Sequence, residues 1–388
     1  MRWFHSVGSL YVEAGSIYNR AATPTNGSKL SQEDLPMKTN DARALSNPSR
    51  TRLATLIALC CLMAPAPARA NPYLAKPGEA PVAVRVATCA ISGGFTHLYT
   101  AMDNGLFDKY GFKVSHSFIA GGSAALAALA SDDIQFLYCA ADATLPGLAT
   151  GVDGKLVAAP LIGLPYVLIS RKEINRIEDL KGKSVGVSRP GDLDDRLMKA
   201  LLKKLNLSTA DVPLRPVGGS QPERYTAMAQ GIVQAVPVTP PLDARAKKEG
   251  FNVIYQFNDL KLPFIYSSVH ATPKTLKEKP VWVQRFVAAM AESIHFVEKN
   301  PDKAKASLSK ALKVSEPDAL QSAYDTYAVS LVNRSMIVPA NALAEAVEVA
   351  RENGTNIRKK PTELYDNSYA EQLEKSGFLK ELWGSEMR

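Results

Sequence analysis

The hydrophobic residues between about residue 82 and residue 270 fall into short apolar runs separated by amphipathic stretches. The runs Val82–Cys89, Lys113–Ile119 and Ile134–Cys139 predict β-strands, and the stretches Thr96–Asn104 and Ser123–Ala130 between them predict α-helices. Strands that alternate with helices in this way build mostly parallel sheets. The pattern therefore predicts an α/β fold.

A second series of the same kind follows Tyr166–Ser170 and leads into the apolar run Leu262–His270. Its expected strands and helices are Ser184–Val187, Leu193–Leu205, Val212–Val217, Pro222–Gln230, Ala235–Val238, Leu242–Glu249 and Asn252–Tyr255. The segment Leu129–Phe136 of the first series is similar to Met228–Ala235 of the second, since each reads as a helix end, a turn and a buried strand. The repetition predicts two similar lobes.

Helices dominate the chain after Pro280. Apolar residues recur with a period near 3.6 in Val281–Lys299, and the further helical stretches are Pro301–Leu312, Glu316–Val329 and Asn341–Asn353. The tail from Lys359 to Arg388 is charged, with a few apolar anchors. We expect this tail to lie on the first lobe.

The composition is that of an ordinary folded protein. The chain has 388 residues, of which 46% are hydrophobic and 22% charged, and this argues against extended disorder. Its formal net charge of +8 arises partly from residues 1–70. The remaining excess of basic residues is too small to indicate a nucleic-acid partner.

An apolar run at Leu53–Ala64 follows Arg50 and Arg52 and precedes Ala68-Arg69-Ala70. A basic segment, a short apolar segment and an A-x-A site are typical of a secretory signal peptide. A membrane-spanning helix needs about 20 apolar residues, so the run is too short to be one. We expect a signal peptide over residues 37–70, cleaved after Ala70, and we expect residues 1–36 to result from an upstream start and to be unstructured.

Two cysteines, Cys89 and Cys139, remain after that cleavage. A pair of cysteines in an exported protein raises the possibility of a disulfide. Each cysteine ends a predicted strand, and a bridge between adjacent parallel strands fits poorly with disulfide geometry. The sequence therefore favours two small buried thiols, with the disulfide as the alternative.

Three segments carry a resemblance to a known family. They are Asn104–Val114, which reads Asn-Gly-Leu-Phe-Asp-Lys-Tyr-Gly-Phe-Lys-Val, then Glu178–Val187, and Ala227–Ala235 with Pro240 beyond it. They resemble the periplasmic solute-binding proteins of the nitrate/sulfonate/taurine and thiamine-precursor type. The resemblance covers roughly Val82 to His270. This chain has Gln135 and Gln234 where the family usually has Asp.

The resemblance implies a type-II periplasmic-binding-protein fold, with two α/β lobes of mostly parallel sheets joined by a two-strand hinge. It implies a protein that captures a small organic molecule in the cleft between the lobes by hinge closure and delivers it to the membrane permease of an ABC importer. It further implies a periplasmic monomer that is not an enzyme and needs no cofactor, metal or nucleic acid.

The expected organisation follows from the resemblance and the predicted elements. Residues 78–166 together with 268–345 would form the first lobe, and residues 167–267 the second lobe with the hinge crossings. Residues 346–388 would be a tail that packs on the first lobe. The crossings themselves are expected at Tyr166–Ser170 and Leu262–His270.

The sequence contains no recognisable catalytic motif. The segment Gly182-Lys183-Ser184 lacks the first glycine of a phosphate-binding loop, because position 177 is Ile, and it enters a strand where such a loop leaves one. An exported enzyme on the same fold, related to pyrimidine-precursor synthases, is the alternative function, with His97 and Asp142 as its only candidate pair. A lone histidine such as His97 is more often a helix-surface residue than a ligand contact.

The ligand-binding residues are expected beyond the carboxyl ends of the strands, where helices begin and offer free N–H groups. Applied to the predicted strands, this rule and the neighbouring side chains select Ser92, Gly93, Phe95, Thr96, Gly122, Ser123, Asp142, Tyr166, Asp192, Asp194, Gln221, Tyr225 and Thr239.

An acidic cluster stands at one of these helix starts. Asp192, Asp194 and Asp195 would oppose the positive end of the helix and disfavour an anion, so that a cationic or neutral ligand, stacking on an aromatic residue such as Phe95 or Tyr225, is expected. Helix capping is the simpler explanation of the same residues. Arg189 and Arg224 lie nearby in the sequence and would offset the negative charge.

Overall fold

A computed structural model of the protein describes residues 71–387. The predicted signal peptide and the predicted upstream start lie outside these residues. Among residues 71–387, no helix has both the length and the apolar character that crossing a membrane requires.

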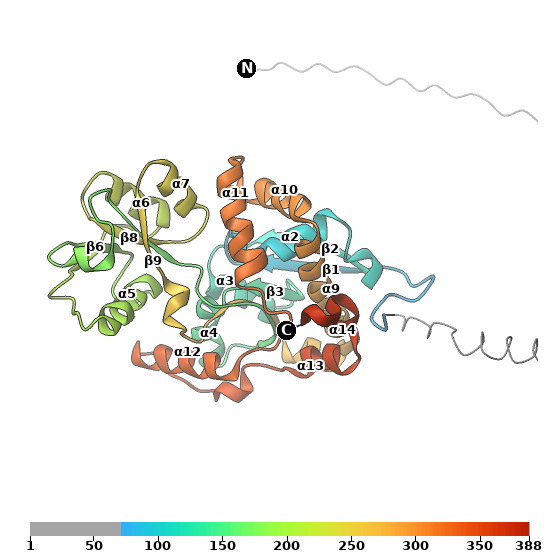
Figure 1. The fold of residues 1–388 in the computed structure, drawn as a ribbon. Helices are drawn as coiled ribbons and strands as arrows, with labels where there is room; N and C mark the ends of the chain where they lie inside the picture. Colours follow the sequence, from blue (N-terminus) through green and yellow to red (C-terminus); the bar gives the residue numbers. More distant parts are fainter. Residues whose placement is uncertain (1–70, 388) are drawn as a thin grey trace, which may run out of the picture. The chain divides into compact units, whose positions relative to one another are not determined.

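The first sheet has five strands in the order β2-β1-β3-β10-β4 (Figure 1). β1 is parallel to both of its neighbours, whereas β10 is antiparallel to β3 and β4. Four strands therefore run in one direction and only β10 runs against them. The strands are β1 Val82–Thr88, β2 Phe112–Phe118, β3 Phe136–Cys139, β4 Lys155–Ile162 and β10 Ile265–Ala271.

The second sheet repeats this plan in the order β7-β6-β8-β5-β9. Its antiparallel strand is β5, which pairs with β8 and β9. In each sheet, the strand that runs against the others is the one that arrives directly from the other sheet. The prediction of two α/β lobes with mostly parallel sheets is confirmed. The strands are β5 Val167–Ser170, β6 Val185–Val187, β7 Leu214–Pro216, β8 Ala235–Val238 and β9 Asn252–Gln256.

The helices that cover the first sheet come from two separate parts of the chain. Those between its strands are α2 Thr96–Asp103, α3 Gly122–Ala130 and α4 Ala141–Ala149. Those that follow β10 are α8 Pro273–Glu278, α9 Pro280–Lys299, α10 Pro301–Leu312, α11 Pro317–Tyr324, α12 Ala340–Glu352, α13 Ser368–Lys375 and α14 Phe378–Trp383. The second lobe carries α5 Leu193–Lys204, α6 Gln221–Ala229 and α7 Leu242–Lys248.

The helix expected at Glu316–Val329 differs from the prediction. α11 ends at Tyr324, and a π-helical turn, Asp325–Ser330, takes its place. π-Helical turns inside α-helices are frequently found at functional sites. This turn places Tyr327 inside the protein, where its side chain is buried.

The C-terminal segment contributes side chains to the core around the first sheet. Leu364, Leu373, Phe378 and Trp383 are buried in the same hydrophobic cluster as the strands of that sheet. Leu156 in β4 also forms a parallel bridge with Tyr365. Burial of these apolar residues stabilises the tail on the first lobe.

The sequence repeat noted above corresponds to one hydrogen-bond pattern used twice. The Gln135 Oε1 atom accepts from the Arg85 backbone N–H at 2.9 Å, and the Gln234 Oε1 atom accepts from the Ser184 backbone N–H at 2.9 Å. Each glutamine directly precedes a central strand, β3 or β8, and its side chain bonds to the backbone of the chain at the neighbouring strand, β1 or β6. The two Gln residues that depart from the family pattern have this structural role.

Cys89 and Cys139 form a disulfide, with their Cα atoms 5.3 Å apart. The expectation of two free thiols was therefore wrong. β1 ends at Thr88, which pairs with Tyr138, so Cys89 lies one residue beyond the sheet and opposite Cys139. A Cα separation of 5.3 Å lies within the range that a disulfide spans. The bridge joins the two strand ends from which two of the expected ligand-binding loops depart.

The two crossings between the lobes run side by side. The Gly163 backbone N–H donates to the Phe264 carbonyl at 2.8 Å, and the Leu164 N–H donates to the Asn258 side chain at 3.3 Å. Gly163 has a φ of +97°, and a Cβ atom there would lie 2.7 Å from Asn258. A glycine is therefore required where the chain leaves the first lobe.

Candidate functional site

The loop after β1 forms a platform for two aromatic rings. The Ser92 side chain accepts from the Gly94 backbone N–H at 3.1 Å and caps a 3₁₀ turn, Gly93–Phe95. A Cβ atom on Gly93 would lie 2.4 Å from the Tyr327 ring, and one on Gly94 would lie 2.5 Å from the Tyr266 ring. The two glycines are thus needed so that two tyrosines can rest on this loop.

Tyr266 and Tyr327 form a stacked pair at this position, with ring centroids 5.6 Å apart and an interplanar angle of 24°. Their hydroxyl oxygens are 3.4 Å apart, and the Ser92 hydroxyl lies 3.4 Å from that of Tyr266. Burial raises the pKa of both tyrosines, so both hydroxyls remain protonated donors at neutral pH. Sequence reasoning missed this pair, because Tyr327 reaches the site through a π-helical turn that no pattern predicted.

The lobes contact each other at the strand ends. The Tyr327 hydroxyl donates to the Pro240 carbonyl of the second lobe at 3.4 Å. The Ser322 hydroxyl in α11 donates to the buried carboxylate of Asp243 in α7 at 2.8 Å. α7 and α11 accordingly lie side by side in Figure 1. The carboxyl ends of the strands of both lobes therefore border one shared region.

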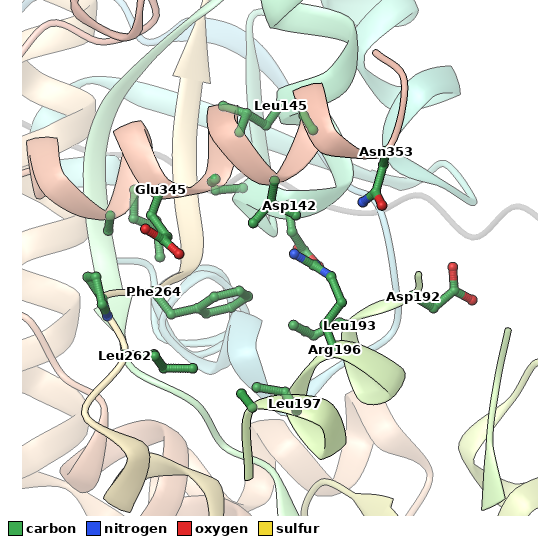
Figure 2. Close-up of a pocket in the computed structure, with 18 of the residues that line it drawn as sticks. Asp142, Leu145, Asp192, Leu193, Arg196, Leu197, Leu262, Phe264, Glu345 and Asn353 are labelled. Carbon is green, nitrogen blue, oxygen red and sulfur yellow. The ribbon is translucent and has the colours of Figure 1, made fainter. Parts of the chain in front are cut away.

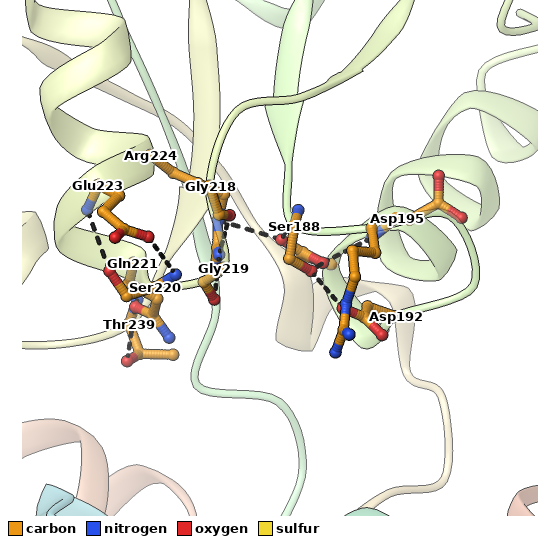
Figure 3. Close-up of polar contacts among 12 residues, drawn as sticks. Ser188, Asp192, Asp195, Gly218, Gly219, Ser220, Gln221, Glu223, Arg224 and Thr239 are labelled. Atoms are coloured by element: carbon orange, nitrogen blue, oxygen red, sulfur yellow. Dashed lines mark hydrogen bonds and ion pairs between the residues drawn. The ribbon is translucent and has the colours of Figure 1, made fainter.

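The carboxylates of the acidic cluster at the start of α5 accept hydrogen bonds from neighbouring groups of the same lobe (Figure 3). The Asp194 carboxylate accepts from the Ser188 backbone N–H at 2.9 Å and from the Ser188 hydroxyl at 2.6 Å. The Asp195 carboxylate accepts from the Gly191 N–H at 2.8 Å and from the Lys199 ammonium at 2.7 Å. Asp194 and Asp195 thus satisfy N–H groups of the loop before α5, whereas the N-cap residue Asp192 makes no side-chain capping hydrogen bond, so the explanation by helix capping is not seen in its usual form.

At the start of α6, side chains of the same lobe also accept hydrogen bonds from backbone N–H groups. The Ser220 side chain accepts from the Glu223 N–H, and the Glu223 carboxylate accepts from the Ser220 N–H at 2.9 Å. The Gln221 Oε1 atom accepts from both the backbone N–H and the hydroxyl of Thr239, at 2.7 and 3.1 Å. An oxyanion would have to displace the Ser220 side chain to reach the Glu223 N–H, and the Glu223 carboxylate to reach the Ser220 N–H.

Arg224 offsets part of the negative charge, as its position in the sequence suggested. Its Nε atom lies 3.1 Å from the Asp194 carboxylate, and both side chains are more than nine-tenths buried. Its Nη1 atom donates to the carbonyls of Gly218 and Gly219 at 3.3 and 3.1 Å. Arg224 therefore joins α6, the loop after β7 and the start of α5, and the half-site of the second lobe is close to neutral.

Several expected ligand contacts lie inside the lobes. Phe95 and Thr96 are buried in the first lobe, where the Phe95 ring packs edge-on against Tyr138 at 5.1 Å. Tyr225 is buried in the second lobe and donates its hydroxyl to Glu249 at 2.6 Å. Neither aromatic ring offers an open face in this structure on which a ligand could stack.

The other expected contacts lie in different surroundings. Gly122 is buried, and a Cβ atom there would lie 2.1 Å from the Ala143 carbonyl, so it allows α3 and α4 to pack closely. Ser123 beside it is exposed. Tyr166 is half-buried in the first crossing, and burial raises the pKa of its hydroxyl. Contact of these residues with a ligand stays a prediction.

Asp142 and Asp192 line a cavity of about 550 Å³, shown in Figure 2. Its walls come from α4 and α12, from α5, and from the second crossing at residues 262–265. Asp142 is half-buried, and this burial raises the pKa of its carboxyl, whereas the positive charge of Arg196 acts in the opposite direction. Within the described residues, no group of three His, Cys, Asp or Glu side chains is placed to hold a metal ion.

His97 is fully buried, so its interpretation as a helix-surface residue was wrong. Neither ring nitrogen has a hydrogen-bond partner, and burial alone lowers its pKa to about 3. The charge of Asp142 does not influence that pKa. The candidate catalytic pair of His97 with Asp142 thus has no support in the geometry of the described residues.

The variant His97→Leu should make the protein less sensitive to acid. The unfolded chain takes up a proton on this histidine below about pH 6.5, whereas the folded protein does so only near pH 3, so the free energy of unfolding falls as the pH drops through that window. Removing the group should reduce the loss between pH 7 and pH 5 by about 2 kcal/mol. Urea unfolding at both pH values measures the effect, with His295→Leu, a half-buried histidine, as the control with the smaller change.

Two α/β lobes of identical strand order, joined by two adjacent crossings and with their strand ends facing a shared region, define the periplasmic-binding-protein fold. The family model described as NMT1/THI5 like matches residues 92–304, which is more than half of the chain. The protein therefore belongs to the NMT1/THI5-like family, as the sequence motifs predicted.

Similar proteins are found both by sequence and by structure. A Brucella abortus (strain 2308) protein named "Putative binding protein" is 27% identical over 240 residues, covering 60% of this chain and 72% of its own. A sulfonate-binding protein SsuA of Methylobacillus flagellatus KT superposes with a TM-score of 0.62 at 20% identity, covering 78% of this chain and 96% of the other. The aliphatic sulphonate binding protein SsuA of Escherichia coli gives a TM-score of 0.58 at 20% identity, with 71% and 88% covered.

Proposed function

We propose that this protein is the periplasmic substrate-binding component of an ABC importer and captures a small organic molecule between its two lobes. The observation that carries this proposal is the arrangement of the strand ends. Loops from both sheets border one region, contact each other through Tyr327 and Pro240, and are connected by two adjacent crossings. The family membership and the solute-binding proteins among the structural neighbours support the same function.

Capture would proceed by rotation of the lobes about the two crossings. A ligand that touches both lobes stabilises the form in which they are closed and shifts the population toward that form. The first lobe would comprise residues 78–166 and 268–345 with the tail, and the second lobe residues 167–267. The closed form would then be recognised by the membrane permease of the importer.

The ligand would not be a simple oxyanion. The SsuA neighbours bind sulfonates according to their names, and helix N-termini are the usual anion sites of α/β proteins. In this chain, Asp194, Asp195 and Glu223 bond to N–H groups just before α5 and α6, and the N–H groups of Asp195 and Glu223 within the helix starts bond to Asp194 and Ser220. A ligand with no net negative charge avoids the cost of displacing those carboxylates.

The protein would bind its ligand without transforming it. The buried His97 leaves Asp142 without a base partner, and the relatives are described as binding proteins. Incubation of the purified protein with its recovered ligand separates the alternatives. An unchanged ligand agrees with transport, whereas turnover would favour the enzyme on the same fold.

Native mass spectrometry of protein purified without denaturation provides the main test. We expect a single small molecule to be retained at a 1:1 ratio and to carry no net negative charge. A thermal-shift panel of amines, amino acids, aromatic compounds and oxyanions complements it, because a ligand at about 100 times its Kd stabilises the folded state by about 2.7 kcal/mol. Retention of a sulfonate or nitrate would contradict the proposed ligand class but not the binding function.

A further inference from the structure

The cavity between α4, α5, α12 and the second crossing has mainly apolar walls, to which neither tyrosine of the stacked pair contributes (Figure 2). Phe264 from the second crossing is half-buried, and its ring stands in the middle of the view. The other apolar side chains of the lining include Leu145, Leu164, Leu193, Leu197, Ala342 and Ala346. A volume of about 550 Å³ is within the range of small-molecule sites.

Two charged side chains face each other across this cavity, one from each lobe. Arg196 is carried by α5 of the second lobe, and Asp142 stands in the first turn of α4 of the first lobe. Figure 2 shows the two side chains pointing toward one another. In the part of the chain that the structure describes, no ion pair joins them, and the buried Nε atom of Arg196 has no hydrogen-bond partner.

Two of the other charged residues of the lining, Lys199 and Asp192, are bonded to partners outside the cavity. Lys199 is paired with Asp195 at 2.7 Å, and Asp192 accepts from Ser188 and points away from the cavity in Figure 2. Glu345 and Glu352 of α12 are exposed, and Figure 2 shows the Glu345 carboxylate near Phe264. Arg196 and Asp142 are the pair of opposite charges that lies on α5 and α4, one from each lobe.

We propose that this cavity binds a zwitterionic amino acid with an apolar side chain, with the ligand carboxylate on Arg196, the ligand ammonium on Asp142 and the side chain against Phe264. This inference rests on the proposed binding function and names its substrate class. The Arg196 guanidinium offers donors that match a carboxylate in a bidentate geometry. The half-buried Asp142 carboxylate, which has no ion pair within the described residues, gains a direct cationic partner.

A zwitterion fits these walls better than a singly charged ligand. A carboxylate alone would satisfy Arg196 and leave a second negative charge close to Asp142, while an amine alone would satisfy Asp142 and approach Arg196. An amino acid satisfies both groups and carries no net charge, in agreement with the occupied helix starts of the second lobe. Its two charged groups would also join α4 to α5, and hence one lobe to the other.

α12 gives the site its own specificity. It lies beyond residues 92–304, the part of the chain that the family model matches, and its residues Ala342 and Ala346 are small. Small residues on this wall leave space for an aliphatic or aromatic side chain. Filling this wall should exclude large ligands and spare small ones.

Calorimetric titration with four matched probes tests the assignment. L-phenylalanine and L-leucine carry both charged groups, 3-phenylpropionate lacks the amine, and phenethylamine lacks the carboxylate. We expect binding of at least one of the two amino acids and at least tenfold weaker binding of both truncated probes. Equal or tighter binding of a truncated probe would overturn the proposal, and so would the absence of binding by both amino acids.

Variants then assign the two charged groups. Arg196→Gln and Asp142→Asn should each weaken binding of the amino acid about thirtyfold or more. Lys203→Gln, which removes an exposed cation of α5 that does not line the cavity, should leave the affinity within threefold of the unaltered protein. Circular dichroism and the melting temperature show whether each variant is folded, and Arg196→Lys provides a second variant that keeps the charge and loses the bidentate geometry.

The outcome for the substrate class is separable from the outcome for the binding function. If native mass spectrometry recovers a different bound molecule and neither amino acid binds, the binding function stands and the zwitterion is excluded. If no molecule is retained and no compound of the panel shifts the melting temperature, both proposals fail. Affinity for an amino acid that Asp142→Asn and Arg196→Gln leave unchanged would place the ligand elsewhere.

Discussion

Replacing Cys89 and Cys139 together by serine is expected to lower the free energy of unfolding by about 4 kcal/mol. The disulfide closes a loop with a sequence separation of 50 residues, and opening it restores conformational entropy to the unfolded chain. Both cysteines are buried at the ends of central strands, so the substitution also introduces two buried hydroxyl groups. Urea unfolding of the variant and the unaltered protein measures the difference.

The same bridge should matter for ligand binding. It joins the chain just before Ser92, which carries the tyrosine platform, to the chain just before Asp142, which lines the cavity.

Treating the unaltered protein with a reductant under native conditions provides the matched control for the double substitution, because it opens the bridge without changing side-chain size. A stability that neither the reductant nor the double substitution changes would show that the bridge does not form in solution.

The fold was predictable because the signals that define its strands, helices and turns each lie within a short stretch of sequence. The apolar runs, the glycines that end helices and the repeated phrase before each central strand are short-range signals, and each is used in both lobes. The two sheets have the same strand order, and the similar segments Leu129–Phe136 and Met228–Ala235 lead into corresponding strands, β3 and β8. The disulfide was not predicted, because the predicted strand included Cys89, whereas β1 ends one residue earlier at Thr88.

The candidate site was predictable only in outline. The rule of strand ends and helix starts selected Ser92, Asp142 and Asp192, which do border the tyrosine platform or the cavity. It could not select Tyr327 or Phe264, because these reach the site from a π-helical turn and a crossing. Arg196 lies in the first turn of α5 and was passed over in favour of the aspartates beside it. The positions of Tyr327 and Phe264 depend on packing between parts of the chain far apart in the sequence.

The acidic cluster shows a second limit. Three aspartates in sequence suggested a site that repels anions through its charge, whereas Asp194 and Asp195 act by occupying N–H groups and by pairing with Arg224 and Lys199. The expectation about anions stays a prediction, and the structure suggests a different physical cause for it. Steric and hydrogen-bonding occupation of the helix start replaces repulsion, and it persists at high salt, where repulsion would be screened.

Arg224→Met should be the most damaging single substitution in the second lobe, lowering the free energy of unfolding by about 3–5 kcal/mol. It leaves the Asp194 carboxylate buried without its ion-pair partner and frees the carbonyls of Gly218 and Gly219. Arg189→Ala removes an arginine from an ion pair in which its side chain is 81% exposed, and it should cost less than about 1 kcal/mol. Urea unfolding of both variants gives the comparison.

The double variant Arg224→Met with Asp194→Leu separates the pair from the rest of the lobe. Removing both charges should recover a large part of the loss, because the main cost of the single variant is an unpaired buried charge. The helix start would then present the Ser188 and Asp195 N–H groups that Asp194 now occupies. If occupation of these groups excludes oxyanions, the double variant should bind a sulfonate such as MOPS more tightly than the unaltered protein does, and equal affinity of the two proteins would rule that explanation out.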